Sequence, residues 1–132
     1  MEQKFHIGVK ALIKDADGRI LVSKAPNVGY WDLPGGRIEE GEGIGEALSR
    51  ELREELGSDV EMLGLFDATL AKIRINSGGD VVALCLLVYN CRLRAGAGPD
   101  HGRAHDEFRW VAKAEAMELL GNKFQNEFLE KL

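Results

Sequence analysis

LPGGRIEEGEGIGEALSRELREELGS, residues Leu33 to Ser58, combines a glycine turn, a run of acidic residues and a helical pattern. Between Ile44 and Leu56 the chain has no proline and is rich in Glu, Leu, Ala and Arg, which form helices readily. Gly57 follows, and glycine adopts the left-handed backbone conformation that ends many helices. The stretch therefore predicts a helix over 44–56 that is preceded by an irregular turn.

The predicted helix carries an acidic face. At about 100° per residue, Glu51, Glu54 and Glu55 fall within an arc of roughly 100°. The flank of this arc is apolar and carries Leu48, Leu52 and Leu56. Like charges four residues apart, such as Glu51 and Glu55, destabilise a helix slightly. From the helix alone two interpretations stay open: a solvated acidic face softened by neighbouring arginines, or carboxylates gathered for chemistry.

The turn before the helix favours the second interpretation. Pro34-Gly35-Gly36 lets the backbone approach closely without side chains, and its carbonyl groups could face a cation held by the helix carboxylates. Hard oxygen ligands of this kind select Mg²⁺ or Mn²⁺, and such ions also bind substrate phosphates. A carboxylate beside the metal could deprotonate a bound water. The pattern therefore indicates a site for cleaving a diphosphate linkage.

Two strands are predicted before this stretch. Phe5 to Lys14 and Ile20 to Lys24 are both rich in branched apolar residues. The turn between them, Asp15 to Arg19, contains an Asp-Gly pair that is typical of a β-hairpin. Ala25 to Asp32 then forms a loop that leads into the glycine turn.

The rest of the chain alternates between strand and helix patterns. Val81 to Tyr89 is apolar throughout, as expected of a central strand that is covered on both faces. The other predicted elements are one long or broken strand at Val60 to Ile75, a short strand at Glu107 to Ala112, and helices at Lys113 to Leu120 and Lys123 to Leu132. Together they predict an α/β fold with helices on both faces of a sheet.

Composition limits the kinds of partner. The 132 residues are expected to form one domain, 1–132. The net charge of −5 argues against nucleic acid or an anionic membrane as partner, because both need clustered lysine and arginine. A phosphorylated small molecule stays possible, since a bound divalent metal reverses the local charge. Two cysteines without CxxC spacing, no signal-peptide pattern and no membrane-length apolar run favour the cytoplasm.

At this point the sequence resembles a known family. Gly36, five residues, Glu42, seven residues and then the run Arg50 to Gly57 are similar to the Nudix box. Eight of its nine specified positions agree, and Ser58 stands where the box has a final bulky aliphatic residue. That departure concerns packing at the helix exit and leaves the chemical positions unchanged. The preceding Trp31 to Gly35 also looks like the usual lead-in of the family.

The resemblance implies an α/β/α sandwich with a mixed sheet. It further implies hydrolysis of a nucleoside diphosphate linked to another group, by water and with Mg²⁺ or Mn²⁺. The partner would be a small-molecule nucleotide, and a homodimer is common in the family. The alternative is a Nudix-fold module that binds or regulates without turnover. Such modules often lose box glutamates, whereas the three on the predicted helix are present.

The resemblance also assigns roles to residues of the box. Glu54 and Glu55 would bind the metal, together with the carbonyl of Gly35. Glu51 would be either a further ligand or the general base. Arg50 would hold the loop to the helix by a salt bridge with Glu42. The residues implied in catalysis are accordingly Glu51, Glu54 and Arg50.

Many members of the family add an acidic residue just before a Trp-containing strand. Glu107 is the candidate here for a further metal ligand, with Asp106 as the alternate. Both could instead only cap the edge of a strand. His101 and His105 could contact phosphate or act as a base, although histidines on loops are more often solvated.

The substrate is less well defined by the sequence. The sequence lacks the subgroup markers of ADP-ribose, dinucleoside polyphosphate and coenzyme A hydrolases, so the small MutT-type nucleoside triphosphate pyrophosphohydrolases fit better. Tyr30 and Trp31 could stack on a base or sugar, and Arg37 and Asn122 are also expected to bind substrate. Trp31 could instead, or in addition, pack the loop onto the core, and Asn122 could simply be a helix N-cap.

Overall fold

A computed structural model describes residues 2–57, 59–94 and 106–132 of the protein. The strands are β1 (Phe5–Ile13), β2 (Ile20–Lys24), β3 (Gly35–Arg37), β4 (Val60–Ser77), β5 (Asp80–Leu93) and β6 (Glu107–Val111), and the helices are α1 (Ile44–Leu56), α2 (Lys113–Leu120) and α3 (Asn126–Leu129). Among these described residues, no helix is long and apolar enough to cross a membrane.

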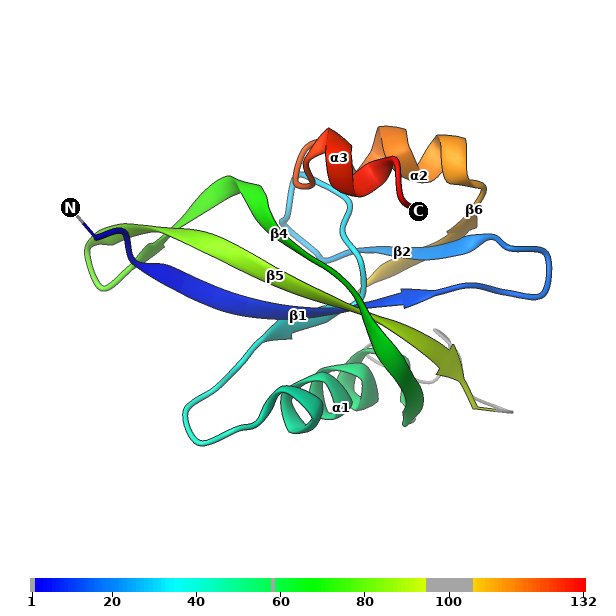
Figure 1. Ribbon diagram of the computed structural model, residues 1–132, viewed down its shortest axis with the longest axis horizontal. Coiled ribbons are helices and arrows are strands. Elements are labelled where there is room, and N and C mark those ends of the chain that lie inside the picture. Colours follow the sequence, from blue (N-terminus) through cyan, green and yellow to red (C-terminus); the bar gives the residue numbers. More distant parts are fainter. Residues whose placement is uncertain (1, 58, 95–105) are drawn as a thin grey trace.

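The central sheet is mixed, as the sequence predicted. Its strand order is β3-β1-β5-β4, with β1 and β5 parallel and the other neighbours antiparallel. Figure 1 shows α1 on one side of this sheet and α2 with α3 on the other, which confirms the α/β class and the three-layer arrangement. A second, two-stranded sheet of β2 and β6 lies beside α2 (Figure 1).

Two hydrophobic cores lie on the two faces of the sheet, because side chains alternate along each strand. In β1, Leu12 packs toward α2 and α3, whereas Val9 and Ile13 pack toward α1. β5 divides in the same way between Leu86 and Leu87. This double burial explains why the sequence of β5 is apolar throughout, and it confirms the prediction of a central strand.

The predicted hairpin between the first two strands is only partly present. The turn forms, with a bridge between Lys14 and Ile20, but β2 then pairs antiparallel with β6, from Ile20 opposite Val111 to Lys24 opposite Glu107. β1 already has β3 at one edge and β5 at the other. β3 covers only Gly8 to Lys10 of β1, and the pairing with β2 stops at the bridge between Lys14 and Ile20. The local turn signal was therefore right, and the longer ladder that it suggested was wrong.

The helix α1 spans the predicted residues and ends where predicted. Gly57 has φ 73°, and its N–H donates to the carbonyl of Arg53. The predicted last helix is shorter than expected: Gln125, and not Asn122, is the N-cap of α3, while Asn122 lies exposed in the preceding turn. The carbonyl of Lys123 accepts from the N–H of Lys72 in β4 over 2.8 Å, so it is not available to a helix.

Candidate active site

The glycine turn lies between β1 and α1. β3 pairs with β1 so that Gly35 is opposite Lys10 and Gly36 is opposite Val9. A Cβ on Gly35 would lie 2.1 Å from the carbonyl oxygen of Val9, and one on Gly36 would lie 2.2 Å from the carboxyl carbon of Glu51. Gly35 also has φ 139°, which other residues rarely adopt. The two glycines therefore allow the backbone to approach both its neighbouring strand and a box glutamate.

Arg50 fastens the loop to the helix. Its Nε and Nη2 donate to the carboxylate of Glu42 over 2.6 and 3.0 Å. Its Nη1 donates to Oε1 of Glu51 over 2.9 Å, and its Nη2 also reaches the carbonyl of Arg37. The hydrogen bond from Arg50 is the main reason that the pKa of Glu42 lies below its usual value. The salt bridge that the family resemblance implies is therefore present, and it also orients Glu51.

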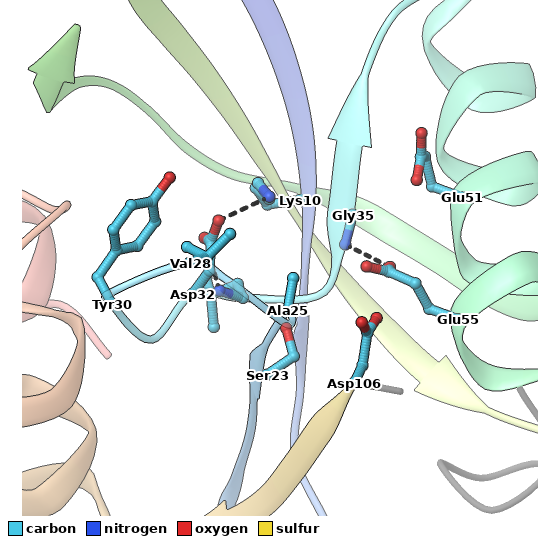
Figure 2. A pocket seen from close by; sticks show the side chains of 11 residues that line it. Lys10, Ser23, Ala25, Val28, Tyr30, Asp32, Gly35, Glu51, Glu55 and Asp106 are labelled. Atoms are coloured by element: carbon cyan, nitrogen blue, oxygen red, sulfur yellow. Dashed lines mark hydrogen bonds and ion pairs between the residues drawn. The ribbon is translucent and has the colours of Figure 1, made fainter. Parts of the chain in front are cut away.

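A cavity of about 180 Å³ opens beside the glycine turn. Figure 2 shows Glu51, Glu55 and Asp106 on one side of it, opposite Lys10 and Asp32. The other lining residues are Ser23, Ala25, Val28, Tyr30, Leu33 and Gly35. One wall of the cavity is thus acidic, and the facing wall carries a cation.

Glu55 is the most buried carboxylate of this wall, with 7% of its surface exposed. Its Oε2 accepts a 2.8 Å hydrogen bond from the N–H of Gly35. Burial raises the pKa of Glu55 to about 7, against the lowering effects of Lys10 and of the Gly35 hydrogen bond. The charges of Glu51 and Asp106 raise it further. A cation bound here would relieve both the burial cost and the repulsion among these carboxylates.

Glu54 lies outside the cavity lining. Its side chain is 45% exposed, and its Oε1 is 3.7 Å from Nη1 of Arg50. Within residues 2–57, 59–94 and 106–132, no group of three His, Cys, Asp or Glu side chains is arranged so that it could hold a metal ion without side-chain movement. Of the three helix glutamates expected at the metal, Glu51 and Glu55 therefore face the cavity and Glu54 adjoins it.

The wall opposite the carboxylates is built around Asp32. Both Lys10 and Lys123 donate to its Oδ2, over 2.9 Å in the case of Lys10, and the N–H of Leu33 donates to its Oδ1. Backbone hydrogen bonds in both directions join Asp32 to Ser23 of β2. The charges of Lys10 and Lys123 outweigh burial and hold the pKa of Asp32 below its usual value. Asp32 is thus a fixed, ionised acceptor for two lysines.

The two loop aromatics take different positions. Tyr30 lines the cavity, and its ring centroid is 5.5 Å from Nζ of Lys123. Trp31 is half-buried and packs against the core on the α2 and α3 side, with the guanidinium of Arg109 4.8 Å from the centroid of its ring. The core-packing interpretation therefore holds for Trp31, and the structure brings only Tyr30 to the cavity.

Three further predicted site residues lie away from this cavity. Arg37 is exposed and contacts Nδ1 of His6 over 3.2 Å. Asn122 is in the exposed turn before α3. Glu107 begins β6 opposite Lys24 and is exposed, because its side chain alternates away from that of Asp106. The structure thus places Asp106, which was the alternate, at the cavity and Glu107 outside its lining. His101 and His105 lie outside the described residues.

The sequence patterns did not indicate the wall opposite the carboxylates, which consists of Lys10, Lys123 and Asp32. Lys10 could have been noticed, because it is a charged residue inside the apolar strand FHIGVKALI. Asp32 belongs to the family lead-in Trp31 to Gly35, which gives no sign of its lysine partners. Lys123 gave no local signal, since its partner Asp32 is 91 residues away in the chain.

A mixed sheet between helices, with a glycine turn and an arginine-clamped glutamate helix at a cavity, defines the Nudix class of hydrolase folds. The family model described as NUDIX domain matches residues 4–132, so the chain belongs to the Nudix hydrolase family. Within this family, the enzyme named 8-oxo-dGTP diphosphatase from Proteus vulgaris is 36% identical over 70 residues. That match covers 50% of the chain and 62% of the Proteus protein, less than two thirds of its length.

Two other proteins cover more of the chain. The CTP pyrophosphohydrolase of Escherichia coli (strain K12) is 28% identical over 116 residues, which are 85% of this chain and 80% of the relative. The crystal structure of a MutT protein from Methanosarcina mazei Go1 superposes with a TM-score of 0.71, covering 99% of this chain and 94% of that one. Its sequence identity is 23%, so this likeness concerns the fold.

Proposed function

We propose that this protein is a metal-dependent pyrophosphohydrolase that acts on a nucleoside triphosphate or a related nucleotide. The observation that carries the proposal is the two-sided cavity, in which Glu51, Glu55 and Asp106 face Lys10. Its size and polarity suit a phosphate chain with its cation. The substrate class is supported by the two relatives, which are named for 8-oxo-dGTP and for CTP.

The residues present fit a divalent cation. In the described part of the chain, Oδ1 of Asp106 is buried without a hydrogen-bond partner. Gly36 leaves the space that the carboxylate of Glu51 occupies, and burial raises the pKa of Glu55. Mg²⁺ or Mn²⁺ would be held by Glu51, Glu55 and Asp106 once these side chains close on the ion, with Glu54 at the margin and with water and phosphate oxygens as further ligands. When bound, the ion would polarise the diphosphate and acidify a bound water.

The protein's own contribution is to position these groups. Arg50 binds one oxygen of Glu51 and both oxygens of Glu42, which sets the direction of the Glu51 carboxylate toward the cavity. The N–H of Gly35 does the same for Glu55. Groups fixed in this way before substrate arrives lower the reorganisation that the reaction requires.

A substrate screen tests the proposal. The purified protein is incubated with Mg²⁺ and nucleoside triphosphates, 8-oxo-dGTP, nucleotide sugars or ADP-ribose, and release of phosphate or pyrophosphate is measured. We expect pyrophosphate and a nucleoside monophosphate from at least one triphosphate. Glu55→Gln should lower kcat/KM by about 100-fold or more, as expected for a group at the reacting centre.

Glu46→Gln is the matched control, because Glu46 is on the same helix but exposed in its first turn. It should leave kcat/KM unchanged. Release from none of the compounds would favour the binding module over the enzyme. Undiminished release by both Glu51→Gln and Glu55→Gln would show that the reaction takes place elsewhere.

A further inference from the structure

Two lysines on the wall opposite the carboxylates share one aspartate. Lys10 and Lys123 share a single carboxylate oxygen, that of Asp32. Both lysines are almost fully buried, at 7% and 4% exposed. A buried ammonium group needs negative groups near it, and for Lys10 these are Asp32, which accepts its hydrogen bond, and Glu55, whose charge acts across the cavity. When Glu55 binds a cation, a phosphate in the cavity can take its place as the second negative group near Lys10.

Only one of the two lysines lines the cavity. Lys10 is part of the lining, whereas Lys123 approaches Asp32 from the turn before α3 and is covered by the ring of Tyr30. An ammonium group has three N–H donors, and Asp32 accepts one from Lys10. Lys10 is therefore placed to donate to a molecule in the cavity, opposite Glu55 (Figure 2).

The surroundings keep Lys10 charged. Burial acts to lower its pKa, but the charge of Asp32 and the hydrogen bond to it outweigh burial and raise the pKa above the usual value. For Lys123, burial and the neighbouring Lys10 lower the pKa to about 8. Both lysines are thus cations at neutral pH, and Lys10 is the one that lines the cavity.

We propose that Lys10 is a substrate-binding residue, whose ammonium donates to a non-bridging phosphate oxygen of the nucleotide while the acidic wall takes the metal. Asp32 is the positioning residue that holds the Lys10 ammonium at the cavity, whereas Lys123 pairs with Asp32 from outside the cavity lining. This inference rests on the proposed function, because it identifies which group of the same site recognises the phosphate chain.

The test compares Lys10→Gln with Lys123→Gln. Each variant removes one positive charge from the same carboxylate and leaves the other lysine paired with Asp32, so the two are matched in charge. Binding of inorganic pyrophosphate, and of a non-hydrolysable α,β-imido nucleoside triphosphate, is measured by calorimetry in Mg²⁺. Lys10→Gln should weaken both by about 10- to 100-fold, as expected for losing a hydrogen bond from a charged group.

Lys123→Gln should weaken binding by no more than about 3-fold, well below the loss of a direct charged contact. Lys10→Arg should restore most of the affinity that Lys10→Gln loses, and KM should change more than kcat. Binding of the unphosphorylated nucleoside should be the same in every variant. Equal losses in the two glutamine variants would show that the lysines only fix Asp32, and unchanged pyrophosphate binding in Lys10→Gln would overturn the proposal.

A second measurement is made on the wild-type protein, which is titrated with pyrophosphate. In protein labelled with ¹³C-lysine, the Cε signal of Lys10, assigned with Lys10→Arg, should shift on adding pyrophosphate, and that of Lys123 should shift less. No shift at Lys10 would overturn the proposal even if Lys10→Gln failed to fold. A wild-type protein that cleaves nucleotides but shows no effect at Lys10 would refute this inference alone. One that neither binds nor cleaves them would refute the proposed function as well.

Discussion

The backbone N–H of Gly35 donates a 2.8 Å hydrogen bond to Oε2 of Glu55, which lies 20 residues further along the chain. This bond joins the short strand β3 to the last turn of α1 and directs the Glu55 carboxylate into the cavity beside Asp106. It also brings an acidic group into a place where little water reaches it. The charge state of the site is therefore linked to the folding of the chain.

The pH dependence of stability should report on Glu55. Burial raises its folded pKa to about 7 from the usual 4.5, so between these values the folded state binds a proton that the unfolded chain has lost. The free energy of unfolding should therefore fall as pH rises from about 4.5 to above 7, by up to roughly 3 kcal/mol. Urea denaturation in EDTA at several pH values measures it. Glu55→Gln should remove this part of the slope, and an identical slope in the variant would contradict the assignment.

Alanine at the two adjacent glycines should have different effects. Gly35→Ala places a Cβ against the backbone oxygen of Val9 at φ 139°, so it should destabilise the fold by roughly 2–5 kcal/mol. Gly36→Ala collides with the end of the flexible Glu51 side chain, which can move aside. It should lower kcat by at least about 10-fold with a smaller loss of stability. Thermal unfolding and kinetics on both variants separate these effects, and the reverse ranking of stability would be inconsistent with the structure.

Asp106 and Glu107 offer a comparison between neighbours. Asp106 lines the cavity, whereas Glu107 is exposed at the start of β6. Asp106→Asn should weaken metal binding by at least about 10-fold, and Glu107→Gln should leave it within about 2-fold of the wild type. Titration with Mn²⁺, followed by electron paramagnetic resonance, measures both affinities. A larger effect at Glu107 would restore it as the ligand that the sequence first suggested.

Tyr30 and Trp31 should separate substrate binding from stability. Tyr30→Ala removes the only aromatic ring among the cavity-lining residues of the described chain, so KM should rise by about 10-fold if the ring stacks on the base. Trp31→Ala removes a half-buried ring that packs on the core, so it should cost roughly 2 kcal/mol of stability with little change in KM. Steady-state kinetics and urea denaturation on the two variants check this. A KM effect confined to Trp31→Ala would reverse the two roles.

Much of the fold followed from local sequence patterns. α1 was predicted over its full length because its composition, its apolar flank and its terminal glycine all agree. The central position of β5 followed from an apolar run that is buried on both faces. The salt bridge between Glu42 and Arg50 was implied by the resemblance to the Nudix box, and the structure contains it.

The remaining features depend on contacts between distant segments. β2 pairs with β6, which comes much later in the chain, and no local signal contains that information. The turn at Lys123 interrupts an apparently helical pattern because Lys72 binds its carbonyl. Likewise, Asp32 becomes part of the site only when β1 and the turn before α3 bring their lysines to it.

The sharing of Asp32 by two lysines has a consequence for how this protein can evolve. When a buried carboxylate has a single counterion, replacing that counterion leaves the carboxylate charge unpaired and strongly destabilises the fold. Here Lys123 remains with Asp32 if position 10 is altered. Residue 10 can therefore be replaced while Asp32 keeps a counterion. This gives natural variants a route, by single substitutions, to different preferences for phosphorylated compounds.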